Sequence, residues 1–134
     1  MTRMHVQGVL TPSSTKSVNE ATADRMDAEM ARNQLVPILR NLADWDILQW
    51  KMGIVKVDSF TETLGGCPAA MDFITRLYMF VTAPGIKELD LQGEMMVTFD
   101  GARGPVIFRV TVANGNVFYN EATVTWENEP IAFM

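Results

Sequence analysis

Hydrophobic and polar residues alternate almost without interruption from Leu89 to Trp126, and this run constrains the fold more than any other feature. A period of two is typical of strands that have one buried and one solvated face. Glycine-containing turns divide the run into three segments. Their apolar residues are Leu89, Leu91, Met95, Val97 and Phe99, then Val106, Phe108, Val110 and Val112, then Phe118, Ala122, Val124 and Trp126. The pattern predicts a three-stranded antiparallel meander with one face covered.

Whether these apolar residues stand at odd- or even-numbered positions, their parity, also predicts how the three strands pair. Directly opposed residues in an antiparallel pair point to the same face of the sheet. A four-residue loop, Gly101–Gly104, would place Phe99 opposite Val106. For the second hairpin, a three-residue loop, Ala113–Gly115, would place Val110 opposite Phe118. Parity therefore favours this loop over the commoner two-residue Asn-Gly turn.

The first half of the chain predicts a helix that is interrupted by a proline. Ser17 and Glu20 have the spacing of a capping box, which predicts a helix over residues 18–34. Pro37 cannot donate a backbone hydrogen bond, so we expect the helix to kink or restart near Val36.

A further strand and a second helix are expected next. Alternation favours a strand over residues 47–57, with a helix as the competing interpretation of its first half. Residues 58–66 are expected to form a connection. Pro68 suits the first position of a helix, because its missing N–H would have no partner there. We predict this helix over residues 68–81, where apolar side chains on nearly all sides indicate burial on two faces.

The order of the elements predicts an α+β domain with helices on one face of a curved sheet. It comprises a kinked N-terminal helix, a strand, a second helix and the meander. We expect residues 1–16 to form an N-terminal arm or edge strand and residues 17–134 to form a single domain. Over roughly the last hundred residues the order is similar in layout to the cone-shaped NTF2-like family, in which helices close over a curved sheet. The resemblance implies a pocket between helices and sheet.

Composition and charge exclude several classes of protein. The net charge of −5 argues against direct contact with nucleic acid, because phosphate binding needs clustered Lys and Arg. No apolar stretch approaches the ~20 residues of a membrane span. The first ten residues lack the apolar core of a signal peptide. With a single cysteine, the expected location is the cytoplasm, or the inside of a particle if the protein is viral.

Cys67 is the one candidate for a reactive thiol. It follows Gly65 and Gly66 at the start of the second predicted helix, where the helix dipole would stabilise a thiolate or an anion. A catalytic thiol needs a base, and the only histidine, His5, lies in the N-terminal arm. The favoured interpretation is therefore a tight turn with Cys67 as a small apolar filler.

Two aspartates and two tryptophans are candidates for a pocket. Asp44 and Asp46 are the closest pair of carboxylates, and such a pair can perform acid–base chemistry or hold a hard cation. They lack a third ligand at a useful spacing, so we expect no metal and no cofactor. Trp50 and Trp126 would suit the lining of a pocket for a small apolar molecule.

The alternation leaves a second face on the meander, which is too apolar for a solvated surface and more polar than a core. Its candidate interface residues are Met96, Ile107, Arg109, Val117 and Tyr119. Arginine and tyrosine are favoured anchors of protein interfaces. Simple solvent exposure is the alternative.

These observations together indicate a protein without catalytic machinery. The sequence shows no plausible Ser/His/Asp or Cys/His constellation and no phosphate loop. We expect a non-enzymatic structural or assembly protein, a homodimer that also contacts other proteins through the second face. An accessory component of a viral or phage particle fits this description. The alternative is an NTF2-like pocket protein that binds or transforms a small apolar molecule.

Overall fold

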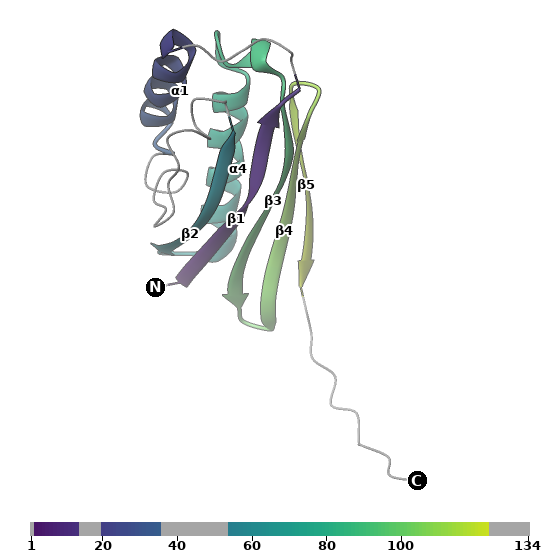
Figure 1. Cartoon of the computed structure of the whole chain (residues 1–134). Coiled ribbons are helices and arrows are strands. Elements are labelled where there is room, and N and C mark those ends of the chain that lie inside the picture. Colours follow the sequence, from purple (N-terminus) through teal and green to yellow (C-terminus); the bar gives the residue numbers. More distant parts are fainter. Residues whose placement is uncertain (1, 14–19, 36–53, 124–134) are drawn as a thin grey trace.

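The computed structural model describes residues 2–13, 20–35 and 54–123 (Figure 1). In chain order the elements are β1 (Thr2–Pro12), α1 (Glu20–Arg32), β2 (Val55–Thr63), α4 (Gly66–Val81), the short 3-10 helix η1 (Lys87–Leu89), β3 (Leu91–Gly101), β4 (Gly104–Ala113) and β5 (Asn116–Thr123).

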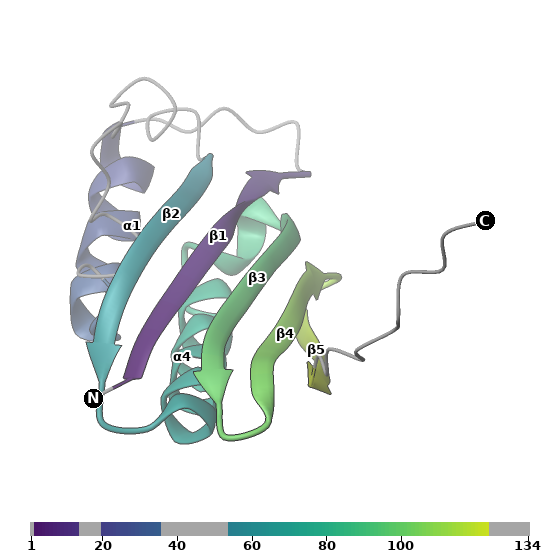
Figure 2. The ribbon, with the colours of Figure 1, turned by 90° about the horizontal axis from the view of Figure 1, so that it is seen from below.

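The five strands form one antiparallel sheet in the order β2-β1-β3-β4-β5. The sheet is curved, and α1 and α4 both lie on one of its faces (Figures 1 and 2). These features confirm the predicted α+β fold, with helices on one face of a curved sheet and a meander at the end. We call the face that the helices cover the inner face and the opposite one the outer face.

The core lies between the two helices and the inner face. On β3 and β4, the residues that the alternation marks as apolar are buried there, namely Leu91, Met95, Val97 and Phe99 on β3 and Val106, Phe108, Val110 and Val112 on β4. The helices contribute Ala70, Phe73, Ile74, Leu77, Phe80 and Val81 from α4 and Ala23, Met26 and Met30 from α1. Burial of these apolar side chains is the main stabilising contribution to the fold.

The N-terminal segment is a central strand, so the prediction of an arm or an edge strand is wrong. β1 pairs with β2 on one side and with β3 on the other. Met4, Val6 and Leu10 are buried in the core. Gly8 stands at the remaining inward position, where a Cβ would lie 2.3 Å from the backbone oxygen of Glu94 on β3. This close approach requires glycine, and the glycine interrupts the alternation by which the strand could have been recognised.

The helices lie close to their predicted bounds, and β2 extends further along the chain than predicted; residues 47–53 of the predicted strand lie outside the described residues. β2 begins at Val55, near the end of the strand predicted over residues 47–57, and continues through most of the expected connection, residues 58–66. Polar side chains at inward positions, such as Ser59, conceal its alternation. Residues 36–53, which include the predicted kink, lie outside the described residues.

The hairpin between β3 and β4 pairs as predicted. Phe99 lies opposite Val106, and the ladder continues to Gly101 and Gly104. The two residues between these glycines form the turn, so the register is as predicted but the loop is shorter than the four residues predicted.

The turn between β4 and β5 contains two residues, so the predicted three-residue loop is wrong. Asn114 and Gly115 have φ angles of 54° and 73°, as a type I′ turn requires. Val110 therefore lies opposite Tyr119 and not opposite Phe118. The twist of a type I′ turn matches that of a hairpin, and this local preference outweighs apolar parity in an edge strand that is exposed on both faces.

Candidate functional site

The outer face of the sheet is not covered by either described helix (Figure 2). It is formed by alternating side chains of all five strands, each exposed or half-buried. They are Lys56, Asp58, Phe60 and Glu62 on β2; Arg3, His5, Gln7, Val9 and Thr11 on β1; Gln92, Glu94, Met96, Thr98 and Asp100 on β3; Pro105, Ile107, Arg109 and Thr111 on β4; and Phe118, Asn120 and Ala122 on β5.

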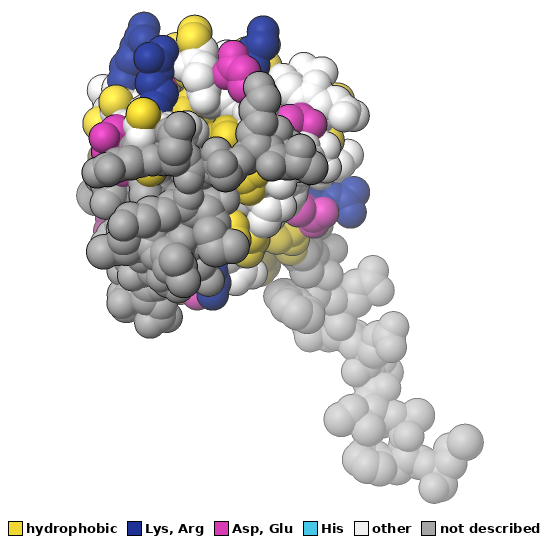
Figure 3. Space-filling view, turned by 45° about the horizontal axis from the view of Figure 1, so that its top comes forward, with side chains coloured by type: hydrophobic (Ala, Val, Ile, Leu, Met, Phe, Trp, Pro, Cys, Tyr) yellow, Lys and Arg dark blue, Asp and Glu magenta, His cyan; other side chains and the backbone are white. Residues whose placement is uncertain are grey.

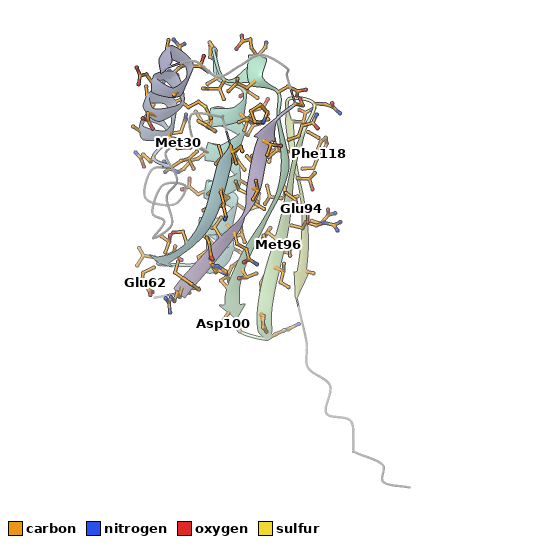
Figure 4. All side chains as sticks on the ribbon, in the orientation of Figure 1. Met30, Glu62, Glu94, Met96, Asp100 and Phe118 are labelled. Carbon is orange, nitrogen blue, oxygen red and sulfur yellow. The ribbon has the colours of Figure 1, made fainter. Side chains whose placement is uncertain are left out.

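Large apolar side chains lie among the polar ones on this face. Phe60 and Phe118 are 52% and 54% exposed. Met96 and Ile107 are half-buried near the middle of the sheet. Figure 4 shows Met96 and Glu94 on the side of the sheet away from α1. Exposed apolar surface with a polar surround is typical of protein interaction sites.

Four side chains of β1 and β2 form an ordered cluster at one end of the outer face. The ring of His5 stacks on that of Phe60, with centroids 4.3 Å apart. The Arg3 guanidinium carbon lies 4.1 Å from the centroid of the same phenyl ring. Asp58 Oδ1 lies 2.6 Å from Nε2 of His5. No described serine, threonine or cysteine forms a hydrogen bond with His5, so the His5–Asp58 pair lacks the nucleophile that a catalytic triad requires.

A shallow hollow of about 380 Å³ lies beside this cluster. Its lining consists of Gln7, Gly8, Val9, Lys56, Val57, Asp58, Glu94 and Met96. Sites for small molecules are concave and bury most of the ligand surface. A shallow hollow bordered by charged side chains is better suited to the side chains of a protein partner.

The structure separates the five predicted interface residues. Three lie on the outer face: Met96, Ile107 and Arg109. The other two, Val117 and Tyr119, lie opposite the inner-face residues Val112 and Val110 and therefore belong to the inner face. The ring of Tyr119 approaches that of Phe108 in the core, with centroids 6.0 Å apart. The prediction that all five share a face is therefore wrong, because the two-residue turn reverses the parity of β5 and brings Phe118 to the outer face.

Cys67, at the start of α4, is exposed. Its thiol donates a hydrogen bond of 3.8 Å to Oε1 of Glu121 on β5. Desolvation raises the pKa of the Cys67 thiol above its ordinary value, and the charge and hydrogen bond of Glu121 raise it further. These effects oppose the stabilisation of a thiolate that the helix N-terminus predicts. His5 lies on the outer face, so the two residues with reactive side chains are on opposite sides of the sheet.

The other predicted site residues, Asp44, Asp46, Trp50 and Trp126, lie outside the described residues. Within the described part, a groove of about 250 Å³ runs between α4 and the strands β1 and β2. No group of three His, Cys, Asp or Glu residues that could hold a metal occurs in residues 2–13, 20–35 and 54–123. No helix in these ranges is long and apolar enough to cross a membrane. Figure 3 shows acidic and basic side chains interspersed over one end of the molecule.

No family model, curated protein or solved structure matches the chain.

Sequence reasoning missed the part of the outer face that β1 and β2 contribute. Phe60 and Asp58 were assigned to a connection, and Arg3 and His5 to an arm. A signal was present, because Lys56, Asp58 and Phe60 alternate with inward residues. It could not be used without knowing that the polar Ser59 between Asp58 and Phe60 points inward.

Proposed function

We propose that this protein is a non-enzymatic assembly protein that self-associates through the outer face of its sheet. The observation that carries the proposal is a five-stranded face that neither described helix covers and on which apolar and charged side chains are interspersed. Its roughly twenty side chains match one side of a standard interface, about 20–30 residues.

The charge of the outer face supports association with a second copy. The face carries three basic side chains, Arg3, Lys56 and Arg109, and four acidic ones, Asp58, Glu62, Glu94 and Asp100. With His5 neutral, it is nearly balanced, although the whole chain has a net charge of −5. Two such faces can approach each other with little of the repulsion that the overall charge would produce.

The residues with reactive side chains do not favour an enzyme. The pKa of the Cys67 thiol is raised by desolvation and by Glu121, and the His5–Asp58 pair has no described nucleophile. Binding through side chains that are already held in place is the function that these groups support. The stacked cluster of Arg3, Phe60 and His5 loses little conformational entropy on association, because its side chains are ordered in advance.

Light scattering over a range of protein concentrations tests the proposal. We expect the wild-type chain to form a dimer and Met96→Glu, on the outer face, to be monomeric. Met79→Glu is the matched control, because Met79 on α4 is 53% exposed and lies on the helix side. It should remain dimeric. A wild-type chain that is monomeric at every concentration would contradict the proposal, and so would dissociation caused by Met79→Glu alone.

A further inference from the structure

The strand register arranges the outer-face side chains in rows that cross the sheet. Residues directly opposed on neighbouring strands point to the same face, so each row runs from β2 to β5. One row is Asp58, Gln7, Met96, Arg109 and Asn120. The adjacent row is Phe60, His5, Thr98, Ile107 and Ala122. The first row therefore has an acid on β2 and a base on β4, while the second has apolar side chains on the same two strands.

A two-fold axis parallel to the strands and between β1 and β3 makes this pattern self-complementary. Sheets that pack face to face commonly keep their strands within about 30° of each other. In a symmetric dimer the same surface is used by both copies. This axis places β2 of one copy over β4 of the other and β1 over β3. Asp58 then lies over Arg109 of the second copy, and Phe60 lies over Ile107.

We infer that two copies pack outer face to outer face about this axis, with the Asp58–Arg109 contact formed twice and determining the alignment. The inference rests on the proposed function and specifies its partner geometry. Both side chains are available for the contact. Asp58 contacts His5 through Oδ1, and its side chain is nevertheless 67% exposed. Arg109 is exposed, and its one described contact is a 3.4 Å hydrogen bond to Asn120.

The outermost rows agree with the same axis. Extending the register of β1 and β3 by two residues places Arg3 opposite Asp100. The axis between these strands then brings Arg3 of one copy over Asp100 of the other. Lys56 falls over Thr111, and Glu94 over Val9, so no two like charges face each other.

An axis that runs along a strand, or across the strands at the first row, brings like charges opposite each other. An axis along β3 would place Glu94 over its own copy and Asp100 over its own copy. An axis perpendicular to the strands, at the row that contains Asp58, would place Asp58 over Asp58 of the second copy. Like charges in direct opposition at an interface cost several kcal/mol. Of the axes compared, the one between β1 and β3 brings Asp58 over Arg109 and Arg3 over Asp100 with no like charges opposed.

Charge reversal with complementation tests the inference. Asp58→Arg and Arg109→Asp, each alone, should weaken the homodimer at least about tenfold, because two like-charge contacts replace two opposite ones. A mixture of the two variants should form a heterodimer with near wild-type affinity. In it, the introduced arginine faces the introduced aspartate, and the second contact keeps the native Asp58 and Arg109. Lys56→Glu is the control on the same face. It should change the affinity little, because Lys56 faces Thr111. Circular dichroism establishes that each variant is folded.

The outcomes separate the inference from the proposed function. Suppose that the wild-type chain is a dimer and Met96→Glu is a monomer, but the mixture of Asp58→Arg and Arg109→Asp does not associate. The inferred axis is then wrong, and the proposed interface on the outer face stands. The axis is also wrong if neither charge reversal weakens the dimer. If the wild-type chain is a monomer, both the inference and the proposed function are overturned.

Discussion

Gly66 shows how the absence of one side chain positions a helix. It is the first residue of α4, and a Cβ at this position would lie 2.1 Å from Cδ2 of Phe99 on β3. The N-terminal end of α4 therefore packs directly against the Phe99 ring. The sequence indicated the Gly-Gly turn as a candidate for anion binding, but its second glycine is explained by this packing.

Replacing Gly66 by alanine should therefore destabilise the fold. We expect Gly66→Ala to lower the free energy of unfolding by about 1–3 kcal/mol, because the added methyl must displace Phe99 or shift the helix. Gly65→Ala is the matched control. The nearest atom to its Cβ would be Pro68 Cδ at 3.6 Å, an ordinary contact. Urea unfolding curves measure both variants, and equal effects would contradict the packing role of Gly66.

The Cys67 thiol should react slowly with alkylating agents near pH 8. Its pKa is raised by desolvation and then by Glu121, so the reactive thiolate is scarcer than for an ordinary cysteine. Glu121→Gln removes the charge, lowers the pKa and should accelerate alkylation. The two rates should converge at a pH at which both thiols are ionised. Because the folded state holds the thiol proton more tightly than the unfolded chain does, ionisation at alkaline pH also reduces stability. An unchanged rate in Glu121→Gln would refute the assigned role of Glu121.

At the scale of elements, Arg76 attaches the end of α1 to α4. Its Nε donates to Asp72 Oδ2 at 2.7 Å, and its Nη1 donates to Gln34 Oε1 at 2.7 Å and to the carbonyl oxygen of Asn33 at 3.3 Å. Gln34 has a positive φ of 57°, and the N–H of Leu35 donates back to the carbonyl oxygen of Met30 at 2.8 Å, as in a Schellman motif. Arg76 thus supports a helix end that uses glutamine where glycine is usual.

Loss of Arg76 should loosen the contact between the helices. We expect Arg76→Met to lower the free energy of unfolding by about 1–2 kcal/mol, since the hydrogen bonds of a charged group are lost. Arg32→Met on α1 is the control, because its one described ion pair, with Glu29, is 3.7 Å long and its side chain is 77% exposed. Hydrogen exchange should also show faster opening at residues 33–35 in Arg76→Met alone. Equal stability of the two variants would show that α1 is held by apolar packing.

The strands show how far the alternation of apolar and polar residues can predict a sheet. It predicted β3, β4 and their register correctly, because each buries one face against the helices. It failed for β5, which is an edge strand exposed on both faces, and whose register is therefore set by Asn114 and Gly115. It also missed most of β2, where Ser59 stands at a buried position. Alternation identifies strands that have one buried and one exposed face. The other strands can be identified only from their turns and from the strands with which they pair.

The candidate site was predictable only in part for a related reason. Met96, Ile107 and Arg109 lie on the meander, whose pairing follows from neighbouring segments of sequence. The row that joins Arg109 to Asp58 crosses β1, which is inserted between β2 and β3. Such contacts depend on strand order. Local periodicity carries no information about strand order, so the charge pattern of the face becomes visible only in the assembled sheet.

At the scale of the whole molecule, the sheet has two different faces, one covered by α1 and α4 and one that neither described helix covers. The inner face is stabilised within the chain by apolar burial. In the inferred dimer, the second copy would bury the outer face. Because the inferred dimer uses the same surface on both copies, association stops at two and does not continue into a filament. The folding and association of this chain should consequently be linked.

That linkage predicts a thermal stability that depends on protein concentration. A dimer unfolds to two separate chains, so mass action favours the folded state as concentration rises. For a domain of this size, each tenfold increase should raise Tm by about 2–4 °C. Met96→Glu, which should be monomeric, provides the control, and its Tm should be constant over the same range. Differential scanning calorimetry at several concentrations makes the measurement. A constant Tm for the wild-type chain, at concentrations that span the dimer dissociation constant, would show that the outer face contributes nothing to stability.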